Sequence, residues 1–219
     1  MSSAPASSKP GSAPSVVPPA LGAVSWHRYV VFFGIAIVGC ALDLASKAYI
    51  FWWPPGPGEQ GEWWLWEGYV GIQKTVNTGA LFGLGRGFSS LFAAVSVVAI
   101  VGVIYWLFVR RAAHDSLLTV ALGSITGGIL GNLYDRLGLW HTAEVQKEFH
   151  YGVRDWILLR YGEFTWPNFN IADCLLVGGV AVLSFHLIFR SPKNDREDEK
   201  SKRTGEKAKG AEEKPAANA

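Results

Sequence analysis

Four aspartates lie within or beside long apolar segments of this 219-residue sequence: Asp43, Asp135, Asp155 and Asp173. Insertion scales assign a charged side chain at the centre of a membrane span a cost of about 3 kcal/mol, so each acid needs a partner or a function. Two carboxylates that meet in a poorly solvated site share one proton, because both cannot ionise cheaply. Such a pair can hydrolyse a peptide bond: the ionised acid takes a proton from water, and the protonated acid donates to the carbonyl oxygen.

Two of these acids follow an asparagine at the same spacing. Asn132 precedes Asp135 by three residues, and Asn170 precedes Asp173 by three. On a helix this spacing places both side chains on one face. Asp155 comes from the segment that joins the two Asn and Asp pairs, so it can reach the same place. Spacing alone does not select which two of the four aspartates form a catalytic pair.

A second interpretation is that the aspartates form ion pairs with basic residues close to them in the sequence. Asp43 and Lys47 stand at i and i+4, a spacing that brings opposite charges together on a helix. Two further pairs are available: Asp135 with Arg136, and Asp155 with Arg154. This interpretation remains open at the level of the sequence.

Other catalytic sets find no support. A serine protease needs a nucleophile motif beside a histidine, and neither His141 nor His150 follows one. The sequence contains no phosphate-binding glycine loop and no metal-binding helix motif. Cys40 and Cys174 both lie in apolar segments, where neither a disulfide framework nor a zinc site is expected. We therefore expect no metal and no cofactor.

Four apolar segments are long enough to position these residues in a membrane. A helix that crosses a bilayer needs about 20 consecutive apolar residues. The candidates are Tyr29 to Trp53, Phe88 to Val109, Ser116 to Tyr134 and Ile171 to Phe189. The sequence predicts an all-α integral membrane protein with four transmembrane helices. Within the third segment, Gly123, Gly127 and Gly131 recur every four residues, which favours close helix packing.

The distribution of charge predicts the orientation of the chain. Most of its 20 Lys and Arg residues lie before the first span, between the second and third spans, or after the fourth. By the positive-inside rule both termini are cytoplasmic, and the loops 54–87 and 135–170 face outward. Most of the 10 Trp lie in or beside these loops, as expected for an interfacial aromatic belt. A net charge of +2 does not indicate a nucleic-acid partner.

The composition divides the chain into three parts. Residues 1–25 are rich in Ser, Ala and Pro, and residues 191–219 mix Lys with acids, so both are expected to be disordered cytoplasmic tails. Residues 26–190 form the membrane domain. In its outer loops, Tyr69–Val76 and the alternating residues from Tyr151 to Leu159 predict two short strands that pair in a small sheet.

Five sequence blocks carry a resemblance to a known family. The blocks are DLASK (Asp43 to Lys47), NTGALFG (Asn77 to Gly83), GGILGNLYDR (Gly127 to Arg136), VRDWI (Val153 to Ile157) and FNIAD (Phe169 to Asp173). With these blocks in this order, the chain resembles lipoprotein signal peptidase, the bacterial signal peptidase II, which is an aspartyl protease of the inner membrane. GGILGNLYDR resembles the most characteristic segment of that family.

This resemblance implies that Asp155 and Asp173 form the catalytic dyad. It also implies a set of residues that support the dyad, the substrate or the surrounding loops: Asn77, Gly79, Gly128, Asn132, Arg136 and Asn170. Asp43 and Lys47, with Asp135, would be structural polar residues. The implied substrate is a diacylglyceryl-modified prolipoprotein in a phospholipid bilayer, cut before its lipidated Cys. The implied enzyme is a monomeric multi-pass protein of the bacterial inner membrane, with its active site toward the periplasm.

Three alternatives remain beside this interpretation. The stretch from Leu137 to Gly152 is longer than in typical members, so Glu144 and Glu148 are fallback candidates for the first acid. A small proton-coupled transporter or channel subunit would also carry acids in its spans. Finally, the letters IVGC that end at Cys40 resemble a lipobox, which would make the chain itself a lipoprotein.

Overall fold

The computed structural model describes residues 24–58, 60–79, 85, 87–140, 149 and 151–189. Four helices in this part of the chain are long and apolar enough to cross a membrane. They are α1 (Trp26–Trp52), α2 (Ser89–Ile104) with its π-helical continuation η2 (Tyr105–Val109), α3 (Ser116–Arg136) and α4 (Ile171–Phe189). The chain is a multi-pass membrane protein, and the four predicted spans are confirmed to within a few residues at each end.

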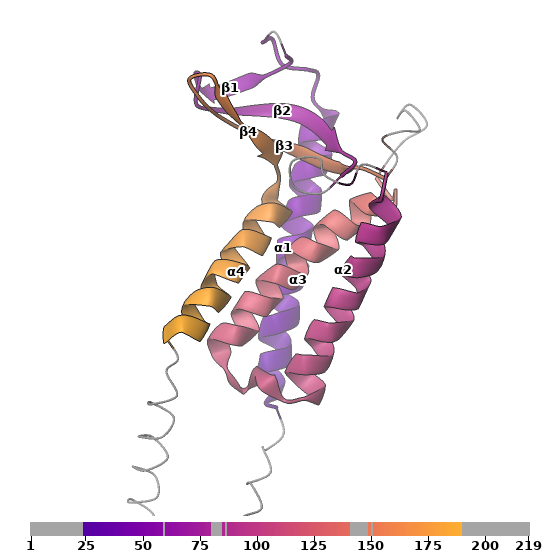
Figure 1. The fold of residues 1–219 in the computed structure, drawn as a ribbon, viewed down its shortest axis with the longest axis vertical. Helices are drawn as coiled ribbons and strands as arrows, with labels where there is room; N and C mark the ends of the chain where they lie inside the picture. Colours follow the sequence, from indigo (N-terminus) through magenta and orange to yellow (C-terminus); the bar gives the residue numbers. More distant parts are fainter. Residues whose placement is uncertain are drawn as a thin grey trace, which may run out of the picture.

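Helix α3 forms the centre of the bundle. Most of its length is buried, whereas most of each other helix is exposed. Figure 1 shows α3 lying among the other three helices, with the small sheet above one end of the bundle. A Cβ on Gly127 would lie 2.9 Å from the carbonyl oxygen of Ala36 in α1, and one on Gly128 would lie 2.5 Å from that of Ala172 in α4. The predicted close packing along the glycine stripe is therefore confirmed.

Helices α3 and α4 each begin after a residue whose side chain accepts a backbone hydrogen bond from the first turn. After η3 (Ala112–His114), α3 starts at Asp115, whose Oδ1 accepts the backbone N–H of Leu118 at 3.0 Å. Helix α4 starts after Asn170, whose Oδ1 accepts the backbone N–H of Asp173 at 3.0 Å. Each contact satisfies a donor that the first turn of a helix leaves free.

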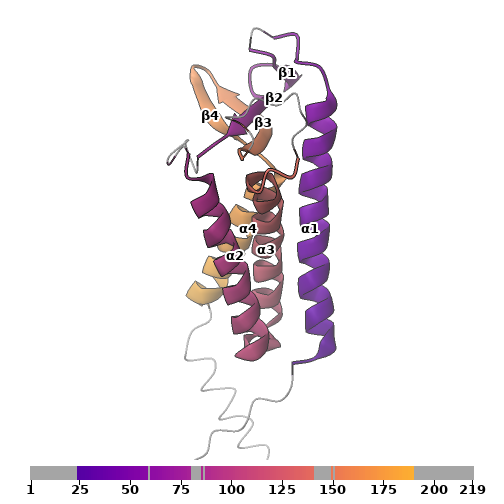
Figure 2. The ribbon, with the colours of Figure 1, turned by 90° about the vertical axis from the view of Figure 1, so that its right-hand side faces the viewer.

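A four-stranded antiparallel sheet joins the helices at one end. Its strands are β1 (Trp63–Trp66), β2 (Val70–Asn77), β3 (Val153–Tyr161) and β4 (Phe164–Phe169), in the order β1-β2-β3-β4. The two strands predicted from the sequence correspond to β2 and β3. Their predicted pairing is confirmed, with Thr75 opposite Asp155. Strands β1 and β4 extend the sheet beyond the two strands expected. In Figure 2 the sheet lies beyond the helix ends, on the side away from the start of α1 and the end of α4.

One face of the sheet is apolar from Asp155 outward. Asp155, Ile157, Leu159 and Tyr161 alternate along β3 and so share a face. Their partners across the sheet point the same way: Ile72 and Phe169 beside Ile157, Val70 and Trp166 beside Leu159, and Phe164 beside Tyr161. An apolar surface therefore begins at this carboxylate and runs outward along the strands.

Candidate active site

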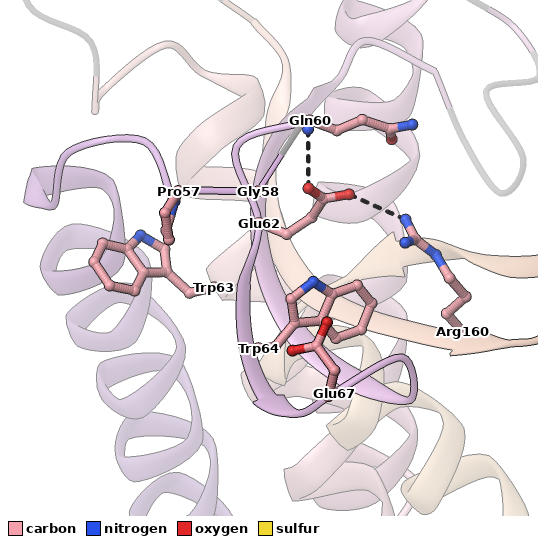
Figure 3. Close-up of a pocket in the computed structure, with 8 residues that line it drawn as sticks. All are labelled: Pro57, Gly58, Gln60, Glu62, Trp63, Trp64, Glu67 and Arg160. Carbon is pink, nitrogen blue, oxygen red and sulfur yellow. Dashed lines mark hydrogen bonds and ion pairs between the residues drawn. The ribbon is translucent and has the colours of Figure 1, made fainter.

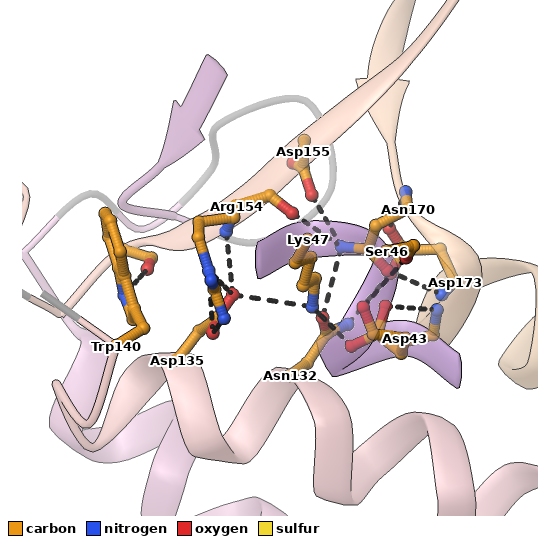
Figure 4. A network of polar contacts seen from close by, with 12 residues as sticks. Asp43, Ser46, Lys47, Asn132, Asp135, Trp140, Arg154, Asp155, Asn170 and Asp173 are labelled. Carbon is orange, nitrogen blue, oxygen red and sulfur yellow. Dashed lines mark hydrogen bonds and ion pairs between the residues drawn. The ribbon is translucent and has the colours of Figure 1, made fainter. Parts of the chain in front are cut away.

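The site lies where β3 and the first turn of α4 meet the end of α3. Asp155 lies on β3 and is 3% exposed, and Asp173 lies in the first turn of α4 and is half-buried. Figure 4 shows both acids beside Asn170, with the side chain of Asn132 reaching up from α3. The structure thus brings together the two aspartates that the resemblance selected.

Asn170 connects the two acids. Its Nδ2 donates to Oδ1 of Asp155 at 2.6 Å, and its backbone N–H donates to Oδ2 of Asp173 at 3.1 Å. Its own Oδ1 accepts the backbone N–H of Asp173, so Asn170 and Asp173 form a reciprocal capping pair at the start of α4. Asn170 is completely buried. A single buried residue therefore fixes both carboxylates, one through its side chain and the other through its backbone.

Two further asparagines complete the hydrogen bonding of the acids. Asn132 donates from Nδ2 to Oδ1 of Asp173 at 3.0 Å, and its Oδ1 accepts from Nδ2 of Asn170 at 3.2 Å. Asn77, at the end of β2, makes a side-chain hydrogen bond with Asp155. The resemblance implied that these asparagines support the dyad, the substrate or the surrounding loops, and the structure places their side-chain amides against the two carboxylates.

Burial raises the pKa of Asp155 from its ordinary value of 3.8 to about 7. Loss of hydration is the largest cause, and the nearby charge of Asp173 acts in the same direction. The hydrogen bonds from Asn170 and Asn77 and the charge of Lys47 oppose this rise. With a pKa of about 7, Asp155 carries a proton through the mildly acidic range, as a carboxylic acid that donates to a carbonyl must.

The other two aspartates belong to a buried chain of charges beneath the dyad. Lys47 Nζ lies 2.6 Å from Oδ2 of Asp43 and 3.4 Å from Oδ2 of Asp135. Arg154 lies 2.7 Å from the other oxygen of Asp135. Asp43, Lys47 and Asp135 are completely buried. The chain alternates in sign, which is how buried charges are tolerated.

These contacts resolve the ion-pair interpretation. The pair of Asp43 with Lys47 is confirmed. The pair of Asp135 with Arg136 is wrong as an account of that acid, because the described partners of Asp135 are Lys47 and Arg154. The pair of Asp155 with Arg154 is wrong for the same reason: neighbours on a strand point to opposite faces, and the Arg154 guanidinium is held by Asp135.

Arg136, the last residue of α3, contacts the turn that follows β2. Its Nη2 donates to the carbonyl oxygen of Gly79 at 3.4 Å, and its guanidinium lies 5.4 Å from the ring centre of Phe92. The backbone N–H of Gly79 donates in turn to Oδ1 of Asn77 at 3.0 Å. Arg136 and Gly79 therefore position Asn77, which contacts Asp155.

Some expected site residues lie elsewhere. Gly128 packs against the backbone of Ala172 and makes room for α4 rather than contacting an acid. Glu144 and Glu148, the fallback acids, lie outside the described residues. Arg154 has a larger structural part than the sequence indicated, because its guanidinium also lies 5.0 Å from the ring centre of Trp140. The only signal for it was its place beside Asp155.

A surface hollow of about 630 Å³ lies apart from these acids, on the outer part of the sheet. Figure 3 shows Glu62 and Arg160 joined across it, with Trp64 beside them. The Glu62 and Arg160 ion pair measures 3.1 Å, and none of the hollow's lining residues contacts Asp155 or Asp173. The dyad and the hollow are separate features.

Comparison with protein families now identifies the chain. The family described as signal peptidase (SPase) II matches residues 35–189, which include every residue of the site described above. The chain belongs to the signal peptidase II family. As a member of this family it is a membrane peptidase, and its recognition from the five sequence blocks is confirmed.

Curated relatives carry the same family name. The chain is 52% identical over 176 residues to a lipoprotein signal peptidase of Rhodopirellula baltica, covering 79% of each sequence. It is 36% identical over 121 residues to a lipoprotein signal peptidase of Symbiobacterium thermophilum, covering 55% of this chain and 72% of that relative. The match with the first relative extends across most of the membrane domain.

Two solved structures share the fold of this signal peptidase II chain. Both are described as bacterial membrane enzyme structures obtained by the in meso method. The first has a TM-score of 0.59 at 23% identity and covers 72% of this chain and 87% of its own. The second has a TM-score of 0.58 at 24% identity, with coverage of 73% and 94%. These likenesses concern the arrangement of helices and strands.

Proposed function

We propose that the protein is an aspartic endopeptidase that removes signal peptides from diacylglyceryl-modified prolipoproteins, with Asp155 and Asp173 as its catalytic dyad. One observation carries this proposal: the fully buried Asn170 binds both carboxylates at once, that of Asp155 through its side-chain amide and that of Asp173 through its backbone N–H. Asp43 and Asp135 are occupied by Lys47 and Arg154, which leaves the other two acids for chemistry.

The two acids take different parts in hydrolysis. Asp155, whose pKa burial raises to about 7, carries the proton that is donated to the scissile carbonyl oxygen. Asp173 lies in the first turn of α4, where the helix dipole favours negative charge, and accepts the proton of the attacking water. Attack gives a tetrahedral intermediate with two hydroxyl groups. The proton on Asp173 then passes to the leaving amine as the carbon–nitrogen bond breaks, and Asp155 takes a proton back from one hydroxyl, whose oxygen becomes the carbonyl of the new carboxylic acid. The dyad returns to its starting state with one proton.

The surroundings of the dyad suit a substrate that lies in the membrane. The apolar face of the sheet begins at Asp155 and continues through Ile157 and Leu159. A signal helix beside the bundle would present its end to the dyad, while the acyl chains of the diacylglyceryl group stay in the lipid. Cleavage immediately before the lipidated Cys follows if that residue lies at the boundary between the sheet and the bilayer.

The proposed orientation follows the charges. With both termini in the cytoplasm of a bacterial cell, the sheet and the dyad face the periplasm across the inner membrane, and residues 26–190 are a monomeric peptidase domain. The tails expected at residues 1–25 and 191–219 lie almost entirely outside the described residues. A membrane-impermeant maleimide tests this orientation on Glu163→Cys, at the exposed turn between β3 and β4, after both native cysteines are replaced. Labelling from the periplasmic side is expected. Labelling only after lysis would show that the sheet faces the cytoplasm instead.

Purified Asp155→Asn and Asp173→Asn variants test the dyad on a diacylglyceryl-modified prolipoprotein. Each substitution keeps the size of the side chain and removes its ability to exchange a proton, so turnover should fall by at least about a thousandfold. Glu163→Gln makes the same chemical change at an exposed position and should keep wild-type turnover. Near wild-type turnover in either dyad variant would disprove the assignment. Cleavage of an unlipidated precursor at an equal rate would disprove the proposal that the enzyme acts on diacylglyceryl-modified prolipoproteins.

A further inference from the structure

The ammonium group of Lys47 makes two hydrogen bonds and one further ion-pair contact. It lies 2.6 Å from Oδ2 of Asp43, 2.9 Å from Oδ1 of Asn132 and 3.4 Å from Oδ2 of Asp135. A lysine ammonium has three N–H groups, and here three acceptors surround it. Lys47 is completely buried. Figure 4 shows it between the end of α3 and the segments that carry the two acids.

One series of contacts connects Lys47 with Asp155 through Asp135 and Arg154. Asp135 binds Arg154 twice: through its guanidinium at 2.7 Å and through its backbone N–H, which donates to Oδ2 at 2.9 Å. This backbone contact fixes the strand at the residue immediately before Asp155. The guanidinium is held in addition by the rings of Trp140 and Phe51, at 5.0 and 5.9 Å.

Two other series of contacts connect Lys47 with Asp173. Oδ1 of Asp43 accepts the backbone N–H of Ala172 at 2.9 Å, which fixes α4 at the residue immediately before Asp173. Asn132 accepts from Lys47 and donates to Oδ1 of Asp173 at 3.0 Å. Both dyad segments are therefore held, one residue away from each acid, by carboxylates that share one ammonium.

We propose that Lys47 is a positioning residue that sets the separation of the two catalytic carboxylates by holding Asp43 and Asp135 in one place. This inference rests on the proposed function of Asp155 and Asp173. Its physical basis is that the position of a catalytic group matters steeply: a misplacement of about 1 Å can lower a rate by about a hundredfold. A lysine that served stability alone would not need to connect both segments.

Lys47 also contributes to the charge around Asp155. The groups that act on this carboxyl come from every neighbouring segment: Asp173 from α4, Arg136 from α3, Lys47 from α1, and the side chains of Asn170 and Asn77. Lys47 lowers the pKa of Asp155 and so limits the rise that burial causes. Its loss should therefore move the proton release of Asp155 to higher pH.

The experiment uses the full-length enzyme with the paired change Asp43→Asn and Lys47→Met. The pair removes one positive and one negative charge, so no net charge is left buried, and the new amide oxygen can still accept the N–H of Ala172. The variant should fold, and kcat on a diacylglyceryl-modified prolipoprotein should fall about 10- to 100-fold with KM within about twofold. The loss of activity at high pH should also begin at a higher pH than in the wild type.

A matched control neutralises the partly buried ion pair of Glu62 and Arg160 on the outer part of the sheet. Glu62→Gln with Arg160→Met removes a pair of similar length, 3.1 Å, that lies away from the dyad. Its kcat and pH profile should match the wild type. If the first variant does not fold, Arg154→Lys tests the same series of buried charges. The lysine keeps a positive charge opposite Asp135 but cannot make the paired hydrogen bonds of a guanidinium, so kcat should fall several-fold.

Two outcomes would overturn the positioning role. The first is wild-type kcat and pH profile in the folded paired variant, and the second, if that variant does not fold, is wild-type kcat in Arg154→Lys. Failure of this inference is distinct from failure of the proposed function. If Asp155→Asn and Asp173→Asn are inactive while the paired variant is fully active, only the role of Lys47 is wrong.

Discussion

The side-chain amide of Asn170 lies 2.6 Å from the carboxylate of Asp155, although the two residues belong to different elements. Asn170 stands at the junction of β4 and α4, and Asp155 stands on the neighbouring strand β3. The backbone N–H of the same residue donates to Oδ2 of Asp173, so one buried asparagine supports both acids of the proposed dyad.

Replacement of Asn170 by Ala should abolish most activity. The change removes the donor to Asp155 and the cap of α4, and leaves buried acceptors without partners, at about 1–3 kcal/mol in stability. Turnover should fall by at least about a hundredfold, measured on a diacylglyceryl-modified prolipoprotein. Asn168→Ala is the matched control, because that amide binds Gln73 in the sheet instead. Equal losses in both variants would contradict the special role of Asn170.

Activity should decline as pH rises through about 7. Asp155 must be protonated to donate to the carbonyl oxygen, and burial raises its pKa to about 7, so the active fraction falls above that value. The measurement is kcat against pH between about 5 and 9, with folding checked by circular dichroism at each pH. A rate that stays constant up to pH 9 would show that Asp155 is not the proton donor.

Asp155→Asn should be more stable than the wild type at high pH. The folded pKa of Asp155 lies above its ordinary value of 3.8, so its protonated form favours folding, and this contribution is lost as pH rises from 3.8 through about 7. The neutral amide avoids that loss. Thermal unfolding in detergent should show a difference of several degrees at pH 8 that disappears near pH 4. A variant less stable than the wild type at pH 8 would contradict this account.

Gly131→Ala should lower kcat by displacing the carboxylate of Asp43. A Cβ there would lie 2.3 Å from Oδ2 of Asp43, so the carboxylate that holds Lys47 must move. Overpacking of this kind costs about 1–3 kcal/mol, and kcat should fall at least about tenfold. Gly178→Ala in α4 meets no atom within 4 Å and serves as the control for the same substitution in a membrane helix. Wild-type kcat in Gly131→Ala would mean that the Asp43 carboxylate tolerates displacement.

Metal chelators should leave the activity unchanged. Amide N–H groups of Asn132 and Asn170 point at the oxygens of the two acids, and such donors repel a cation that would need those oxygens as ligands. Turnover measured with and without a chelator, after dialysis against it, should agree within error. Loss of activity that a divalent cation restores would point to metal-assisted hydrolysis.

The membrane helices could be predicted because length and hydropathy alone decide whether a segment can cross a bilayer. The ends of the helices were less predictable than the helices themselves. Helix α3 continues past Tyr134 to Arg136, because its last turn is buried by the rest of the protein and needs no contact with lipid. Strands β1 and β4 were missed. Their aromatic residues are consistent with either a strand or an interfacial loop, and only pairing with β2 and β3 decides between them.

The site could be predicted only in part for a similar reason. The spacing of Asn132, Asn170 and their aspartates indicated one shared depth, and the structure places them together. Nothing local in the sequence pairs Asp135 with Arg154, because 19 residues separate them and the nearer arginine, Arg136, is a more obvious partner. The choice of Asp155 and Asp173 among the four aspartates came from family resemblance, because spacing alone did not distinguish them.

The burial of the Lys47 cluster has a consequence for the environments in which the enzyme can work. Mobile ions weaken attractions between charges that face the solvent, over a distance of about 8 Å at physiological ionic strength. Lys47, Asp43 and Asp135 are closed off from water, so dissolved salt cannot enter between them. The framework beneath the dyad should therefore keep its geometry over a wide range of salt concentration.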